Sequence, residues 1–196
     1  PYSEIYRLSV AVTGEQKEAS WNQKPAAADF YYLRNWLEKI LRRFGLDIYA
    51  LKTEALESDL FGQALSIKLN GKEFAQMGVV APVLRDQVDM KQDVYFLEMN
   101  FMQLLNATKK HMVTVNELSK YPEVKRDLAL LADKNVTFAR LREVAFQSER
   151  KLLKSVSLFD VYEGDKLPAG KKSYALSFVL EDKTKTLTDN EIDRIM

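Results

Sequence analysis

The sequence contains no cysteine and only one histidine, His111. These two absences exclude disulfides, thiolate nucleophiles and metal sites built from several histidines. The seven glycines are scattered, so neither a dinucleotide-binding fingerprint nor a phosphate-binding loop can be placed. No apolar run approaches the roughly 20 residues that a membrane helix needs, and the N-terminal residues lack the pattern of a signal peptide. The composition, 46% hydrophobic, is that of an ordinary globular protein of one or two domains.

An excess of charge of one sign is also missing. The formal net charge is +1, and the parts on either side of Asn116 are each close to neutral. Proteins that bind nucleic acid mainly through phosphate contacts usually carry a clear basic excess. Composition alone therefore argues against such a role, and any contact with RNA must depend on particular side chains.

A few isolated residues could carry chemistry, but each also has a plain structural interpretation. Trp21, in a polar stretch broken by Pro25, is interpreted as a packing anchor, with ligand stacking as the alternative. His111 could act as a general base, yet no acidic or nucleophilic partner is evident, which favours a bystander. We expect no catalytic residue among them.

Two groups of charged residues are equally open to two interpretations. The carboxylates of Asp86, Asp89 and Asp93 could bind a hard cation, but the glycine and terminal glutamate of a calcium loop are missing. A solvated loop face is therefore favoured, and we expect no metal site. Arg42 and Arg43 could bind phosphate, although a solvated helix end is the simpler interpretation.

The first half of the chain predicts an antiparallel sheet with flanking helices. Asp29 should cap a helix whose apolar residues fall at helical spacing and which ends at Gly45. Asn70-Gly71 should turn a hairpin over 65–80, pairing Lys68 with Glu73 and Ile67 with Phe74. The remaining predicted elements are strands over 2–13, 46–53 and 94–99, a helix over 82–88, a helix capped by Asn100, and a connection over 109–118.

The second half predicts a β-α-β-β-α order. A short apolar strand over 127–133 precedes a helix that Thr137 can cap. Strands over 152–162 and 171–182 flank a Gly- and Lys-rich loop. Thr188 and Glu191 have the spacing of a capping box, so a second helix should begin there. This order is the ferredoxin-like split unit without its last strand.

Five blocks of residues in the second half resemble the ferredoxin-fold anticodon-binding domain of phenylalanyl-tRNA synthetase beta subunits. In chain order they are Tyr121-Pro122, Arg126 to Ala129, Phe159 to Gly164, Gly170 to Ser173, and Thr186 to Asp189. A looser resemblance, to the catalytic-like module of the same family, covers Gly78 to Leu84 and Val94 to Glu98.

This resemblance implies an α+β fold with two domains. Residues 1–116 should be part of an inactive, class II synthetase-like antiparallel sheet with flanking helices. Residues 117–196 should be the ferredoxin-like domain, truncated before its last strand because the chain stops at Met196. The chain is accordingly expected to be a fragment of a longer protein.

The resemblance also implies a function. The parent would be a cytoplasmic ligase that joins phenylalanine to its tRNA, with ATP and magnesium, as an alpha2-beta2 assembly. This segment would recognise tRNA and act as a scaffold beside the catalytic alpha subunit, with no cofactor of its own and no membrane partner. No arginine in a Gly-rich helix start is present to clamp ATP phosphates, so we expect no catalysis here.

Alternation along the strands selects candidate RNA-binding residues. Phe159 and Val161 should face a core, which leaves Asp160 and Tyr162 on the open sheet face. In the last strand, Tyr174, Leu176, Phe178 and Leu180 should face the core, and Ser173, Ala175, Ser177 and Val179 the open side.

A tyrosine ring can stack on a base, and carboxylate and hydroxyl groups can bond to base edges. With the resemblance, Asp160, Tyr162 and Ser173 are expected to meet the anticodon. Arg126 could neutralise a phosphate or form an ion pair with a neighbouring carboxylate.

Two other functions remain open on the residues alone. Ferredoxin-like domains also serve as regulatory modules that bind a small metabolite, because fold alone does not fix function. The second half could instead be a purely structural interface, with Tyr162 packed under a neighbouring domain. Titration with tRNA and with amino acids separates these readings.

Overall fold

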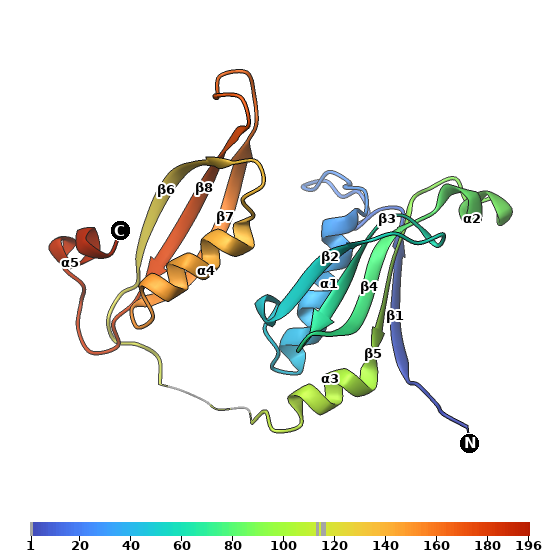
Figure 1. The fold of residues 1–196 in the computed structure, drawn as a ribbon, viewed down its shortest axis with the longest axis horizontal. Coiled ribbons are helices and arrows are strands. Elements are labelled where there is room, and N and C mark those ends of the chain that lie inside the picture. Colours follow the sequence, from blue (N-terminus) through green and yellow to red (C-terminus); the bar gives the residue numbers. More distant parts are fainter. Residues whose placement is uncertain (1, 113, 115–116) are drawn as a thin grey trace. The chain divides into compact units, whose positions relative to one another are not determined.

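The computed structural model describes residues 2–112, 114 and 117–196. The chain forms two compact units, residues 1–114 and 115–196, and each builds its own sheet (Figure 1). The connection predicted over 109–118 includes residues 113 and 115–116, which lie outside the described residues.

Unit 1 is a five-stranded antiparallel sheet in the order β1-β5-β4-β3-β2. Helix α1 lies across one face of this sheet, and the other face stays open (Figure 1). The elements of unit 1 are β1 (Arg7–Thr13), α1 (Phe30–Arg43), the 3₁₀ turn η1 (Ile48–Ala50), β2 (Leu51–Leu56), β3 (Phe61–Leu69), β4 (Lys72–Val80), α2 (Pro82–Gln87), β5 (Val94–Asn100) and α3 (Phe101–Thr108).

Local capping and burial explain why α1 forms where it does. The Asp29 carboxylate accepts the backbone N–H of Tyr32 at 2.7 Å, as the sequence predicts. Three leucines one turn apart, Leu33, Leu37 and Leu41, are fully buried against the sheet. Asn100 caps α3 in the same way, accepting from Gln103 N–H at 3.0 Å. The helices are therefore fixed both by their first turns and by one apolar stripe.

Three predictions in unit 1 are wrong. Trp21 is 97% exposed and anchors nothing within its unit. Residues 46–53 are not one strand, because η1 occupies the middle of this range and β2 begins only at Leu51. The hairpin pairs Lys68 with Glu73 as predicted, but one extra residue in β4 then shifts the register, and Ile67 pairs with Ala75. Because of this one-residue bulge, Phe74 and Ala75 are both buried although they are neighbours in the sequence.

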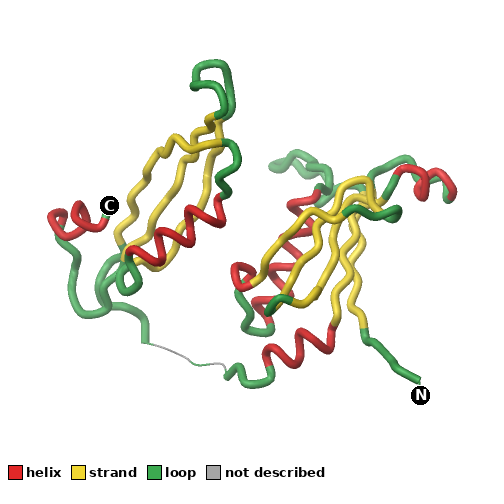
Figure 2. The backbone as a smooth tube through the Cα atoms, in the orientation of Figure 1, coloured by secondary structure: helices red, strands yellow, loops and turns green. Residues whose placement is uncertain are grey.

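Unit 2 has the predicted β-α-β-β-α order, and its three strands lie in the antiparallel order β6-β8-β7 (Figure 2). Helix α4 lies across one face of the sheet (Figure 1). The elements are β6 (Val124–Asp133), α4 (Phe138–Ser148), β7 (Leu153–Tyr162), β8 (Lys171–Leu180) and α5 (Asp189–Ile195).

Both helices of unit 2 start at the predicted caps. The Thr137 hydroxyl accepts the N–H of Arg140, and the Glu191 carboxylate accepts both the N–H and the hydroxyl of Thr188 at 3.0 and 2.9 Å. The bonds to Lys185 and Thr188 lower the pKa of Glu191 to about 2. The buried cluster beneath the helices consists of Leu153, Val156, Leu180, Leu187 and Ile192.

One prediction about strand faces in unit 2 is wrong. Leu158 pairs with Leu176 and Asp160 pairs with Ala175, so Phe159 is an extra residue without a partner in β8. Phe159 is 60% exposed, and Val161, although it pairs with Tyr174 on the covered side, is 42% exposed, so neither fills the core as expected. Leu158 takes the core-facing position next to Leu176 because the bulge breaks the alternation between positions 158 and 160.

Candidate functional site

The side of the β6-β8-β7 sheet opposite α4 is lined mostly by small and polar residues. We call it the open face of unit 2. Residues paired across antiparallel strands share a face, so the register assigns its members. They are Ser173, Ala175, Ser177 and Val179 of β8, Tyr162, Asp160, Ser157 and Ser155 of β7, and Leu131, Ala129, Asp127 and Lys125 of β6.

Three of the predicted site residues come together at one end of this face. Tyr162 pairs directly with Ser173, and Asp160 pairs with the next residue but one, Ala175. The Tyr162 ring is 44% exposed. Within the described residues, none of these three polar side chains makes a hydrogen bond or ion pair with the rest of the chain. An exposed ring, a carboxylate and a hydroxyl are thus left available to a ligand.

The sequence interpretation missed one member of this end of the face. Leu131 pairs with Ser173 from the β6 side, and its side chain is 54% exposed. The sequence predicts a short apolar strand over 127–133, and a nearly continuous run of apolar residues does not show which of them face outward. An exposed leucine on the far side of Ser173 from Tyr162 gives the face an apolar rim as well as an aromatic one.

Small side chains occupy the middle of the open face, so little projects there above the backbone. Ala175 lies between Asp160 and Ala129, and Ser177 lies between Ser157 and Asp127. Ser177 is only 2% exposed, and within the described residues its hydroxyl oxygen finds no hydrogen-bond partner. A flat ring such as a nucleic-acid base could approach the backbone closely along this row.

Arg126 lies on the other side of the sheet. It pairs with Phe178, a residue on the helix-covered face, and its guanidinium donates to Asp189 at the start of α5 at 2.9 Å. Of the two readings of this arginine, the structure shows the ion pair. Arg126 joins β6 to α5 and does not line the face that carries Asp160, Tyr162 and Ser173.

Unit 1 also has an open sheet face, but its polar groups bind one another. Arg7 forms an ion pair with Glu98 at 2.6 Å, and Lys68 forms one with Glu54 on the neighbouring strand. The Glu73 carboxylate accepts from Ser66 at 3.3 Å and from Gln76 at 3.0 Å. Two cations of this face, Arg7 and Lys68, are thus already paired with carboxylates of neighbouring strands.

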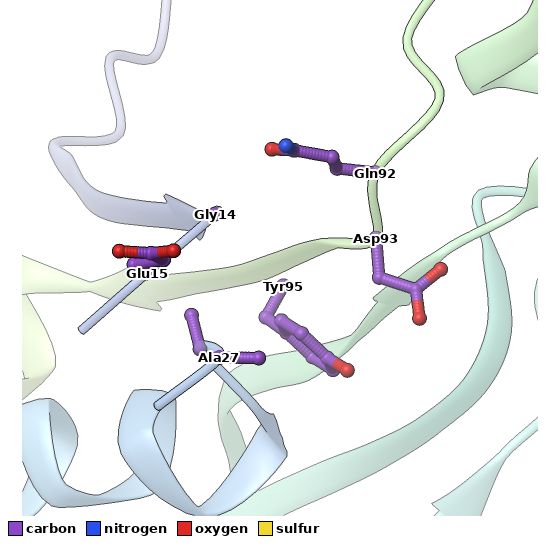
Figure 3. Close-up of a pocket in the computed structure, with 7 residues that line it drawn as sticks. Gly14, Glu15, Ala27, Gln92, Asp93 and Tyr95 are labelled. Atoms are coloured by element: carbon purple, nitrogen blue, oxygen red, sulfur yellow. The ribbon is translucent and has the colours of Figure 1, made fainter. Parts of the chain in front are cut away.

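A cavity of about 350 Å³ lies at one end of the unit 1 sheet (Figure 3). Gly14, Glu15, Gln92, Asp93 and Tyr95 are among its lining residues. Burial first, and then the carboxylates of Asp93 and Asp29, raise the pKa of the Tyr95 phenol. The Asp93 carboxylate is held by Arg85 at 2.6 Å, so it is occupied within the unit.

A second cavity, of about 210 Å³, lies in unit 2 between α4 and the covered face of the sheet. Its lining is almost entirely apolar, with Ser148 and Glu149 as the polar exceptions. The Glu149 carboxylate already accepts the N–H groups of Lys151 and Leu152, which lowers its pKa. Such a lining offers little to a polar metabolite.

Neither a cluster of metal-ligating side chains nor a membrane-spanning helix occurs in the part of the chain that the structure describes. No group of three or more His, Asp or Glu side chains there could hold a metal ion. The carboxylates of Asp86, Asp89 and Asp93 accordingly do not converge on one site. Among the described residues no helix has both the length and the apolar character to cross a bilayer. The His111 ring lies close to Gly45, and the residue is exposed.

Comparisons with known proteins match both units. A family model described as "Ferredoxin-fold anticodon binding domain" matches residues 119–196. A second, described as "Phenylalanyl tRNA synthetase beta chain CLM domain", matches residues 1–101. The two models together account for nearly the whole chain.

Curated relatives named phenylalanine–tRNA ligase beta subunit match over the full length of this chain. The protein from Bacteroides thetaiotaomicron is 46% identical over 196 residues, covering 100% of this chain and 24% of the relative. That from Porphyromonas gingivalis is 39% identical with the same coverage. That from Geobacillus kaustophilus is 36% identical over 97% of this chain and 24% of the relative. The chain therefore spans about a quarter of the length of the curated relatives it matches.

Proposed function

Because the chain belongs to the family of phenylalanyl-tRNA synthetase beta subunits, we propose that it is the tRNA-binding and scaffolding portion of a phenylalanine–tRNA ligase. The complete enzyme joins phenylalanine to its tRNA using ATP. Residues 117–196 recognise the anticodon, and residues 1–116 form a class II-type module that supports them without catalysing.

One observation carries the proposal. Asp160, Tyr162 and Ser173 lie on one exposed sheet face, and in the described part of the chain none of their polar atoms is bound by another residue. Exposed polar groups without a partner in the chain are hydrogen-bonded to water, which a ligand can replace. Three unpaired groups of different chemistry beside a row of small residues suit a flat, polar ligand such as a splayed-out base.

Each of the three side chains has a distinct role in this proposal. The Tyr162 ring stacks on a base, which contributes affinity without selecting a sequence. The Asp160 carboxylate accepts from a base N–H and so selects a particular base edge, because a carboxylate repels phosphate. The Ser173 hydroxyl, paired with Tyr162, bonds to the edge or sugar of the same nucleotide.

Arg126 has no place in this recognition, because it lies on the covered face in an ion pair with Asp189. The face itself is close to neutral, as the whole chain is. Binding through stacking and base-edge hydrogen bonds releases few counterions, so the affinity of this face for RNA depends only weakly on salt.

In this proposal residues 1–116 act as a non-catalytic scaffold for the anticodon-binding domain. On their open face, ion pairs between strands occupy Arg7 and Lys68. In this proposal ATP and magnesium act in the catalytic alpha subunit, with which the beta subunit assembles as alpha2-beta2 in the cytoplasm.

Direct titration tests the proposal. We expect the complete enzyme to bind its tRNA more tightly than the same tRNA with a changed anticodon, and a Tyr162→Ala, Asp160→Ala double variant to lose that preference. Tyr31→Ala is the matched control, because Tyr31 is an exposed tyrosine of α1 in unit 1. Saturable binding of an amino acid to this chain, with an unchanged anticodon preference in the double variant, would favour a regulatory module.

The scaffold assignment has a separate test. The isolated 196-residue chain should not support phenylalanine-dependent exchange of pyrophosphate into ATP. Exchange above the background of heat-denatured chain contradicts the assignment of residues 1–116 as non-catalytic.

A further inference from the structure

Gly164 lies directly beneath the hydroxyl end of the Tyr162 ring. A β-carbon built on Gly164 would be 2.5 Å from the phenol oxygen, 2.8 Å from Cζ and 3.3 Å from Cε2 of Tyr162. Carbon atoms that are not bonded do not approach so closely, so any side chain at position 164 would have to share the space that the ring now occupies.

The backbone does not require a glycine at this position. Gly164 has an ordinary φ, whereas Gly170, at the other end of the same loop, has a φ of +78° in the region that favours glycine. A β-carbon built on Gly170 meets nothing within 4 Å. The loop thus has one glycine whose role is conformational and another whose role is to leave room for a ring.

We propose that Gly164 is a positioning residue of the RNA-binding face, because its missing side chain holds open the place where the Tyr162 ring rests. This inference rests on the proposed role of Tyr162 in binding the anticodon. It goes further by naming what orients the ring before RNA arrives. A ring held in one position loses less freedom on binding than a ring that samples several.

A methyl group at position 164 would move the ring and spare the fold. The crowded atoms belong to the far end of an exposed side chain, not to backbone or core. Real β-carbons essentially never make contacts this short, so the hydroxyl end of the ring must move away, either by rotation within its rotamer or by a change to another. Gly164→Ala therefore changes where the stacking surface lies without removing it.

The test is a thermodynamic cycle in the complete synthetase, with tRNA binding as the readout. Tyr162→Ala should weaken binding by about 5- to 150-fold, which is the range for losing one stacked base. Gly164→Ala should weaken it by about 2- to 12-fold, the range for immobilising one side chain. In the Tyr162→Ala background, Gly164→Ala should have no further effect, because the ring through which it acts is gone.

Gly62→Ala is the matched control, since a β-carbon there meets other atoms only at 3.8 Å. It should leave tRNA affinity unchanged. An independent readout without RNA is the NMR spectrum of the Tyr162 ring, whose resonances should shift in Gly164→Ala while the melting temperature stays within a degree or so of the parent value.

The outcomes separate the two proposals. If Tyr162→Ala binds tRNA as the parent does, the proposed function of the ring fails, and the positioning inference fails with it. If Tyr162→Ala weakens binding but Gly164→Ala does not, only the positioning inference is wrong. Equal losses from Gly164→Ala in both backgrounds, or unchanged ring resonances, also overturn it while leaving the anticodon-binding face intact.

Discussion

The two open sheet faces of this chain look alike as ribbons and differ in their chemistry. Each belongs to an antiparallel sheet with a helix across its other side (Figure 1). In unit 1, Arg7, Glu98, Lys68 and Glu54 are joined in ion pairs between strands. In unit 2, the described residues leave Asp160, Tyr162 and Ser173 without intrachain partners.

This difference shows where binding capacity resides. A ligand on the unit 1 face would have to separate existing pairs before it gained any contact of its own. A ligand on the unit 2 face meets groups whose only competitor is water. The architecture supplies a flat platform in both cases, and the pairing state of the polar groups decides which platform can bind.

The largest expected effect is on the stability of unit 1, whose sheet depends on the buried leucines of α1. Leu37→Ala, in the buried stripe between α1 and the sheet, should destabilise unit 1 by about 2–5 kcal/mol. Unit 2 should keep its melting transition, because its core lies within residues 115–196. Calorimetry of the 196-residue chain measures both. A single transition that shifts as a whole would show that the two platforms are not independent.

The next effect concerns the exposed aromatic side chain of the unit 2 face. Tyr162→Ala should reduce tRNA affinity by ~1–3 kcal/mol and leave the melting temperature of unit 2 nearly unchanged, because we propose that the ring stacks on RNA, and it lies on the open face, outside the core. Filter binding and a thermal melt give the two values. A large fall in melting temperature with unchanged affinity would place the ring in packing instead.

A smaller effect should follow from the carboxylate of the same face. Asp160→Ala should reduce the discrimination between the native anticodon and a changed one by about 1 kcal/mol, the net value of one hydrogen bond. Asp160→Asn is the control, since its amide oxygen still accepts. Competition binding with paired tRNAs measures the difference, and discrimination that survives in Asp160→Ala would remove this residue from specificity.

The smallest effect is expected on the unit 1 face. Arg7→Ala should change the free energy of unfolding by less than about 1 kcal/mol, because Arg7 and Glu98 are substantially solvent-exposed and water screens the pair. It should leave tRNA affinity unchanged. A clear loss of tRNA affinity in Arg7→Ala would mean that the ion-paired face binds RNA too, and the contrast between the faces would break down.

Local signals predicted most elements of the fold correctly. Asp29, Asn100 and Thr137 cap helices where expected, because each capping bond spans only three residues. The Asn70-Gly71 turn likewise fixes its first two pairs. Errors arose at Phe74 and Phe159, where one extra residue shifts a register. Such a shift depends on the partner strand, so the alternation of a single strand cannot show it.

Part of the candidate site was predictable because residues along β8 alternate regularly between the two faces of the sheet. Tyr174, Leu176 and Leu180 alternate regularly and are buried, so the opposite face of β8 follows directly. That face carries Ser173, and pairing then brings Tyr162 beside it. Arg126 pairs with Asp189, which lies 63 positions away in the sequence. A local sequence pattern therefore could not decide between a phosphate contact and an ion pair for this arginine. The contact of this face with RNA stays a prediction.

The bulge at Phe159 has a consequence for changes in strand length. Leu158 faces the core and Asp160 the open side, so the pairing already passes over residue 159. A deletion of Phe159 would restore a regular strand and leave Asp160 and Tyr162 on the face they now occupy. If another residue between Val156 and Tyr162 were deleted and the bulge stayed, the side chains on one side of the deletion would move to the opposite face of the sheet. Variation in length within this strand can therefore be accommodated at one position without moving the site.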